Sequence, residues 1–287
     1  MKFPIYLCVL ELFASILLAQ EKQIDFNSEK NIKKFADYLF CDKDYLRAAE
    51  EYQKLNGYEG NDTIIFKTGL SYLFIGDYST SIDNFSNISS LSPFYENSKL
   101  ERMKAQFLMN DYFGMRSFYN NNNFPEDDSL SDRANRLFTF SYLITEDRLP
   151  QKEKFLLPFN SIEKEKISSF YDWKNDPPYK SSALAGILSA IVPGSGKIYT
   201  GDISDGIFSF LVTGVFTFLA YDNFRADHDT RAWIFTGLAA FFYGGNVYGS
   251  IAAAQIYNAK ITFEFNKGLN VFLESKNYFV PVYEFCN

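Results

Sequence analysis

Two parts of the chain differ sharply in how apolar and polar residues are distributed. Residues 21–180 mix charged and apolar residues, whereas residues 182–257 are largely apolar, with acids and bases mainly in two short loops. Apolar residues at helical spacing predict amphipathic helices, and long apolar runs predict helices that are buried or cross a membrane. The pattern therefore predicts an all-α chain in which a polar helical part precedes an apolar one.

The polar part contains a repeat with a period of 33–34 residues. Asp-Tyr pairs recur at residues 44–45, 77–78 and 111–112, and a large aromatic residue follows each tyrosine by seven positions. A helix-like apolar stretch precedes each pair, and Gly69 lies where the first helix of its unit must pack closely against the second. Gly76 and Asn110, directly before two of the aspartates, suit the left-handed conformation that ends a helix. Each unit therefore predicts a helix, a tight turn and a second helix, and a weaker fourth unit begins with residues 134–144.

This arrangement resembles the tetratricopeptide repeat, and Tyr72…Gly76-Asp77-Tyr78…Ile82…Phe85 is the unit that matches best. The resemblance covers about residues 29–150. It implies a helical solenoid whose first helices line a groove for extended peptides or partner helices. The residues that we expect to be exposed in this groove are Lys67, Ser71, Arg102 and Gln106. Ordinary solvated surface positions are the alternative for each of them.

The apolar part predicts membrane-spanning helices. Residues 182–192 are too few to cross a bilayer, while 203–221 and 232–257 approach or exceed the roughly 20 residues that a spanning helix needs. Small residues four positions apart allow helices to approach closely in lipid. The small residues predicted to pack in this way are Gly186, Gly245, Gly249 and Ala253. Asn246 is expected to face protein and to bond to a neighbouring helix, and a buried hairpin in a soluble protein is the alternative.

A glycine-rich loop at residues 193–197 joins the first two apolar segments. Its sequence, Pro-Gly-Ser-Gly-Lys, departs from the phosphate-binding pattern GxxxxGK[ST] because position 191 is Ile and Ile198 follows the lysine. We therefore predict a tight turn at the membrane surface rather than a nucleotide site. The run from this loop through Tyr199-Thr200-Gly201 to Gly206 resembles the TM2 domain over about residues 180–257. That family has two transmembrane helices.

The N-terminus predicts export. A lysine, an apolar stretch to Ala19 and a polar run follow the plan of a secretory signal peptide, with an uncleaved membrane anchor as the alternative. Export places the repeats on the periplasmic side of a bacterial cell membrane, and two spans return the C-terminus to that side. The predicted parts are a signal peptide (1–19), tetratricopeptide-like repeats (29–150), a charged connector (151–180), a TM2-like membrane domain (181–258) and a tail (259–287). Apolar residues alternate at Ile261, Phe263 and Phe265, so we expect the tail to form a short β-hairpin or to lie on the membrane surface.

Composition bears on the chemistry of the chain. The net charge of −7 argues against nucleic-acid binding, which needs a clustered basic surface. His228 is the only histidine and the carboxylates are scattered, so we expect no catalytic set, cofactor or metal site. Cys41 and Cys286 can pair in an oxidising compartment, but no spacing pattern supports a disulfide, and two free thiols are expected.

These features together predict a membrane-anchored scaffold for protein–protein interaction in the bacterial cell envelope, assisting secretion, membrane-protein insertion or envelope assembly. Its expected partners are a protein in the repeat groove and the lipid bilayer, and its membrane helices can form a homo-oligomer. The alternative is an oligomeric transport or channel component built from the C-terminal helices. The spans lack the series of acids and bases that ion-coupled transport uses, which disfavours that alternative.

Overall fold

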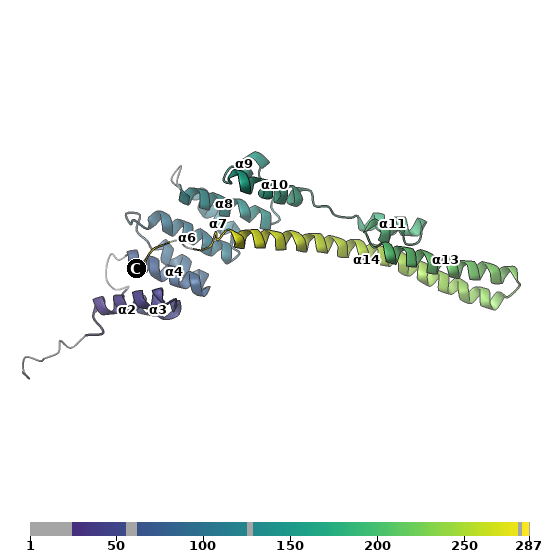
Figure 1. The fold of residues 1–287 in the computed structure, drawn as a ribbon, viewed down its shortest axis with the longest axis horizontal. Coiled ribbons are helices and arrows are strands. Elements are labelled where there is room, and N and C mark those ends of the chain that lie inside the picture. The colour runs from purple at the N-terminus through teal and green to yellow at the C-terminus, as the bar shows by residue number, and fades with distance from the viewer. Residues whose placement is uncertain (1–24, 56–61, 125–128, 281–282, 287) are drawn as a thin grey trace, which may run out of the picture. The chain divides into compact units, whose positions relative to one another are not determined.

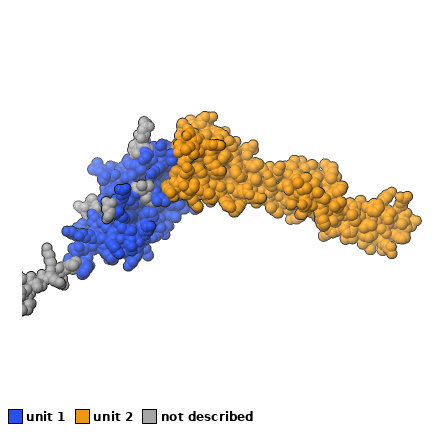
Figure 2. Space-filling model, in the orientation of Figure 1, with its two compact units in different colours: residues 1–141, 279–287 blue, residues 142–278 orange. Residues whose placement is uncertain are grey.

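A computed structural model describes residues 25–55, 62–124, 129–280 and 283–286 (Figure 1). The predicted signal peptide (1–19) lies outside these residues, as does Cys8. All regular secondary structure in the described ranges is α-helical, as predicted. The chain divides into two compact units, unit 1 with residues 1–141 and 279–287 and unit 2 with residues 142–278 (Figure 2). The end of the chain thus belongs with the N-terminal helices and not with the apolar part that precedes it in sequence.

Unit 1 is a series of helix pairs. Each helix packs against the next along the chain from α2 to α7 (Figure 1). The helices are α2 (Glu29–Cys41), α3 (Tyr45–Gln53), α4 (Asp62–Ile75), α5 (Tyr78–Ser86), α6 (Tyr95–Leu108), α7 (Tyr112–Asn121) and α8 (Ser129–Ile144), of which α8 continues into unit 2. The helix–turn–helix units that the repeat predicts are therefore confirmed, including the helix predicted at residues 134–144.

The turn within each helix pair has the same construction. One residue in the left-handed conformation ends the first helix, and the next residue, an aspartate, caps the second helix by accepting a hydrogen bond from a backbone N–H three positions on. The left-handed residues are Lys43, Gly76 and Asn110, with φ angles of 64°, 84° and 64°. The capping residues are Asp44, Asp77 and Asp111. The roles predicted for Gly76 and Asn110 are confirmed, and Lys43 has the same role in the first pair.

Small residues allow the two helices of a pair to approach closely. A Cβ atom added at Gly69 would lie 2.7 Å from Cε1 of Phe85, which is buried. The hydroxyl group of Ser81 donates a hydrogen bond to the carbonyl oxygen of Gly69 (2.8 Å). Any side chain at position 69 would therefore force the ring of Phe85 to shift, which agrees with the packing role that the sequence predicts for this glycine.

Unit 2 contains the apolar helices and the predicted connector. Its helices are α9 (Lys152–Leu156), α10 (Ser161–Asn175), α11 (Ser182–Ile191), α12 (Ser195–Tyr199), α13 (Ile203–Arg225) and α14 (Asp229–Ser275). α13 lies along the first half of α14, where Phe216 stacks on Phe242 with ring centroids 5.2 Å apart. Within the described residues, α13 is the one helix that is long and apolar enough to cross a membrane.

The helix α14 corrects the prediction of a β-hairpin in the tail. It has 47 residues, about 70 Å at the usual helical rise, and continues to Ser275 through the region predicted as a β-hairpin or surface tail. The alternating Ile261, Phe263 and Phe265 suggested a strand. The residues that are buried instead follow helical spacing, at Phe265, Leu269 and Leu273. This face meets α10, whose Phe170 contacts the ring of Phe265.

Candidate functional site

Residues 283–286, called the tail from here on, pack against the first helices of the pairs in unit 1. The ring centroid of Tyr283 lies 5.0 Å from that of Phe66 on α4. The ring of Phe285 lies 6.2 Å from Phe66, 6.2 Å from Phe40 on α2 and 5.9 Å from Phe94, which precedes α6. The tail therefore occupies the face formed by α2, α4 and α6, which is where the sequence predicts a groove.

Two of the four predicted groove residues lie on α4, and both are buried. Lys67 is 7% exposed; its Nζ lies 2.7 Å from Oδ1 of Asp37 and 4.8 Å from the ring centroid of Phe285. Ser71 is fully buried, and its hydroxyl group donates to the carbonyl oxygen of Lys67 (2.9 Å). The expectation that they are exposed is wrong, because the tail covers Lys67 and Ser71 faces the packed interior.

The other two predicted residues, on α6, take part in contacts with α7. The guanidinium of Arg102 lies 4.1 Å from the ring centroid of Phe118 and is half-buried. The amide of Gln106, which is 5% exposed, donates a hydrogen bond to Oδ2 of Asp111 (3.2 Å). Exposure is therefore the wrong expectation for Gln106 as well. Of the four residues, Lys67 lies against Phe285 of the tail.

A buried ion pair at the same face escaped the sequence analysis. Nζ of Lys104 lies 2.6 Å from Oε1 of Glu101, and neither side chain is more than 1% exposed. The hydroxyl group of Tyr283 donates a hydrogen bond to the same carboxylate oxygen (2.9 Å). Among the described residues, Oε2 of Glu101 has no hydrogen-bond partner. An i, i+3 pair of opposite charges on a helix is typical of a solvated surface, so the sequence holds no signal that this pair is internal.

Burial raises the pKa values of both groups in this contact, the carboxyl group of Glu101 and the phenol of Tyr283. Desolvation raises the pKa of Glu101, and the charge and hydrogen bonds of Lys104 and Tyr283 oppose that effect. Burial raises the pKa of Tyr283 too, and the neighbouring Glu101 carboxylate adds to this effect. The phenol therefore keeps its proton and acts as the donor to Glu101.

Cys41 and Cys286 form a disulfide, with their Cα atoms 5.5 Å apart. The expectation of two free thiols is therefore wrong. The two cysteines are separated by 245 positions in sequence. Each of them directly follows a phenylalanine, and the two phenylalanines, Phe40 and Phe285, pack against each other and so bring the cysteines together. Disulfides of this kind persist in oxidising compartments.

In unit 2, Asn246 connects α14 to the glycine-rich loop. Its Oδ1 accepts a hydrogen bond from the N–H of Gly194 (3.0 Å), and its Nδ2 donates to the carbonyl oxygen of Ser189 on α11 (3.4 Å). The hydroxyl oxygen of Ser189 accepts from the N–H of Gly196 (2.9 Å) and lies 2.6 Å from that of Ser250. The prediction that Asn246 faces protein and bonds to a neighbouring helix is confirmed. The loop turns at Pro193 and Gly194 and continues as α12 from Ser195, and these hydrogen bonds hold it against α11 and α14.

The small residues predicted to pack in the membrane have different surroundings. A Cβ atom at Gly186 would lie 3.0 Å from Cγ1 of Ile251, so α11 and α14 approach closely there. One at Gly249 would lie 3.4 Å from Cε of Lys197. Gly245 faces open space within the described residues, and Ala253 lines a pocket beside Lys197. Gly186 is therefore at a close contact between two helices, whereas a Cβ atom at Gly249 would make an ordinary van der Waals contact.

Replacing Asn246 by leucine is expected to lower the free energy of unfolding of unit 2 by about 1–3 kcal/mol, because the buried N–H of Gly194 loses its acceptor. Thermal unfolding in detergent micelles, followed by the fluorescence of the two tryptophans, measures the change. Gln255→Leu on the exposed side of the same helix is the control and should change the stability by less than about 0.5 kcal/mol. Equal losses in the two variants would contradict the assigned role of Asn246.

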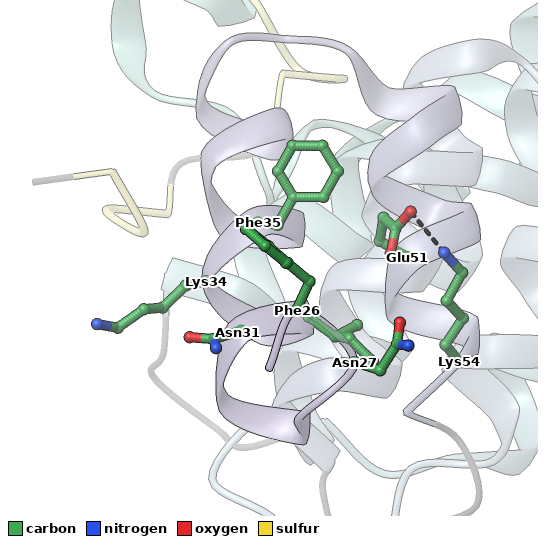
Figure 3. Close-up of a pocket in the computed structure, with 8 residues that line it drawn as sticks. Phe26, Asn27, Asn31, Lys34, Phe35, Glu51 and Lys54 are labelled. Atoms are coloured by element: carbon green, nitrogen blue, oxygen red, sulfur yellow. Dashed lines mark hydrogen bonds and ion pairs between the residues drawn. The ribbon is translucent and has the colours of Figure 1, made fainter. Parts of the chain in front are cut away.

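A separate pocket of about 580 Å³ lies between α2 and α3 (Figure 3). Phe26 and Phe35 line it, and Glu51 and Lys54 form an ion pair at its edge (2.6 Å). The side chain of Lys34 points away from the other residues in Figure 3. The charged groups of this pocket thus do not converge on one point, and the pocket has the character of a surface hollow.

Comparisons of this chain with protein-family models, with curated proteins and with solved structures found no match. The resemblances to the tetratricopeptide repeat and to the TM2 domain therefore stay predictions from the sequence. Within the part of the chain that the structure describes, no group of three or more His, Cys, Asp or Glu side chains is placed to hold a metal ion.

Proposed function

We propose that the protein is a membrane-anchored scaffold for protein–protein interaction in the bacterial cell envelope. In this proposal α2–α8 form a tetratricopeptide-like solenoid outside the cytoplasm, and α13 and the first half of α14 form a two-helix membrane hairpin. The observation that carries the proposal is the disulfide between Cys41 and Cys286. It joins a residue that precedes the apolar helices to one that follows them.

The disulfide supports a hairpin because bonded cysteines lie on the same side of a membrane. The chain between Cys41 and Cys286 must then cross the bilayer an even number of times. α13 has the length and composition of one crossing. α11, with 10 residues, is too short for another, since a span needs about 20 residues. The first half of α14, which packs along α13, is the segment that supplies the second crossing.

Disulfide chemistry also supports the side of the membrane on which unit 1 lies. Cytoplasmic thiols are kept reduced, whereas the bacterial periplasm and the cell exterior are oxidising. The predicted signal peptide places unit 1 on that side as well. The loop between α13 and α14 is then cytoplasmic, where Arg225 and Arg231 at its ends agree with the preference of basic residues for the cytoplasmic side.

A labelling experiment tests the hairpin and its orientation. Lys34→Cys on α2 and Ala226→Cys between α13 and α14 are introduced separately into a Cys8→Ser chain, and both positions are exposed. In intact spheroplasts, a membrane-impermeant maleimide should label position 34, and it should label position 226 only after lysis. Labelling of both positions from outside would show that the chain does not cross the membrane between them.

An affinity pull-down tests the scaffold itself. The full-length protein and a version without residues 29–150 are purified in detergent from the same membranes, and bound proteins are identified by mass spectrometry. Defined partners that are lost with the repeats support the proposal. If the same partners remain, or if neither sample holds a partner, unit 1 is not a scaffold. Unit 2 is then the part of the protein to which a function should be assigned.

A further inference from the structure

The tail binds unit 1 in the manner of an extended peptide ligand. Residues 283–286 have no helical structure, and their side chains alternate: Tyr283 and Phe285 are partly buried while Glu284 and Cys286 are exposed. In an extended chain, alternate side chains point to the same side. The two aromatic side chains therefore contact the face formed by α2, α4 and α6. The side chain between them is exposed, so the site does not select the residue at that position of a ligand.

The position of Tyr283 is built to recognise a phenol. Its ring packs edge-on against Phe66, and its hydroxyl group reaches the buried carboxylate of Glu101. Glu101 already has an unpaired Oε2, so a ligand without the hydroxyl group would leave Oε1 with Lys104 as its sole partner. A site that bonds a ligand hydroxyl group in its interior rejects the analogue that lacks it.

The position of Phe285 is an aromatic box with a cation at its edge. Three rings, those of Phe40, Phe66 and Phe94, lie within 6.2 Å of the ring of Phe285, centroid to centroid. The Nζ of Lys67 lies 4.8 Å from that centroid and is held by Asp37. A cation over an aromatic face is attracted by the ring, more so when it is desolvated. This position therefore selects an aromatic side chain two residues after the tyrosine.

We propose that this face is a binding site for an extended segment of the form Tyr-x-Phe, and that a partner protein's segment of this form replaces the chain's own tail once the Cys41–Cys286 disulfide is open. The inference rests on the proposed scaffold function, since it states the chemistry of the partner. Opening requires a dithiol reductant. Two exchange steps leave Cys41 and Cys286 as thiols and the reductant as a disulfide, with two electrons transferred.

Without the disulfide, a competing partner could displace the tail from the site, even though the tail is part of the same chain. A flexible tether gives an intramolecular ligand an effective concentration in the millimolar range, which a partner at high local concentration can overcome. A covalent bond at Cys286, the residue next to Phe285, removes that competition altogether. In the oxidised chain the tail therefore fills the site permanently. In the reduced chain a partner's segment can replace the tail.

Peptide binding to the full-length chain in detergent tests the proposal. The triple variant Tyr283→Ala, Phe285→Ala, Cys286→Ser empties the site without changing the residues that form it. A fluorescent peptide that copies residues 279–286, with serine for cysteine, should bind this variant saturably and should not bind the oxidised wild-type chain. A peptide with phenylalanine in place of the tyrosine should bind at least about tenfold more weakly, as expected for the loss of a hydrogen bond to a charged group. A folded triple variant that binds neither peptide overturns the proposal.

A second measurement applies if the triple variant does not fold. The single variant Cys286→Ser keeps the tail and frees Cys41. Peptides that end in cysteine are offered to it in a glutathione buffer, and the mixed disulfide with Cys41 is measured by mass spectrometry. The Tyr-x-Phe-Cys peptide should be trapped at least about tenfold more than an Ala-x-Ala-Cys peptide, because binding raises the local thiol concentration. Equal trapping of the two overturns the proposal.

The outcomes separate this inference from the scaffold function. If the peptide binds while the pull-down yields no partner, the Tyr-x-Phe binding site is supported and the scaffold function is contradicted. If a partner is captured through unit 1 and an excess of the Tyr-x-Phe peptide does not displace it, the scaffold function stands and this inference falls.

Discussion

Replacing Lys104 by methionine is expected to lower the free energy of unfolding of unit 1 by about 3–5 kcal/mol, since removing one partner of a buried ion pair leaves an uncompensated charge. The remaining charge is the carboxylate of Glu101, which is no more than 1% exposed. Urea unfolding followed by hydrogen exchange and mass spectrometry measures the change, because it reads the helices of unit 1 separately from those of unit 2.

A second ion pair in the same unit is a matched control for this effect. Lys54 and Glu51 have the same spacing in sequence and the same 2.6 Å distance from Nζ to Oε1, but the lysine side chain is 55% exposed. Lys54→Met is expected to change the stability by less than about 1 kcal/mol, as is usual for an exposed pair. If the two variants lose equal stability, the burial of Glu101 and Lys104 is not the source of the effect.

The loss in Lys104→Met should depend on pH in a defined direction. Burial holds the pKa of Glu101 above its ordinary value of 4.5, and the variant removes Lys104, whose charge opposes this shift together with the hydrogen bond from Tyr283 and the charge of Arg133. Between 4.5 and the raised pKa, the folded state binds the proton more tightly than the unfolded state, so stability decreases as the pH rises through that window. The cost of the variant should therefore be greatest at neutral pH and should shrink on acidification toward 4.5.

Removing the disulfide with Cys286→Ser is expected to lower the stability of unit 1 by about 2–5 kcal/mol, because the bond closes a very long loop and thereby restricts the unfolded chain. The loop spans 245 positions and includes all of unit 2. The same hydrogen-exchange measurement applies, and protection of α2 and of the tail should fall together.

The three cysteines supply the controls. Cys41→Ser should cost as much as Cys286→Ser, and the double variant should cost no more than either single variant, since all three break the same bond. Cys8→Ser, at the position outside the disulfide, should have no effect on unit 1. Additive losses in the double variant would show that the two cysteines act through separate contacts.

Local features of the structure could be predicted from particular residues. The Asp-Tyr pairs and the types of Gly76 and Asn110 marked the turns of unit 1, because helix ends depend on capping side chains and on one left-handed residue nearby in sequence. Gly69 and Asn246 were also placed correctly. A glycine or an amide within an apolar helix has few uses other than close packing or a hydrogen bond across helices.

The tail and α14 were not predictable in the same way. The alternation at Ile261, Phe263 and Phe265 indicated a strand, but the partner that decides the buried face is α10, nearly a hundred residues earlier in sequence. The disulfide and the contact of Tyr283 with Glu101 join residues 245 and 182 positions apart. The pattern of apolar residues within one helix cannot predict contacts between residues so far apart in sequence.

The sequence by itself determined where the helix pairs of unit 1 turn, that residues 203–221 have the length and composition to cross a membrane, and that Asn246 needs a protein partner. Each of these depends on residues within a few helical turns. Only the tertiary structure decided that the predicted groove is filled by the chain's own tail, that Lys67 and Glu101 are buried with partners, and that Cys41 is paired. Those outcomes depend on which distant surfaces meet, and burial sets the pKa of Glu101 only after that meeting has removed water from its carboxylate.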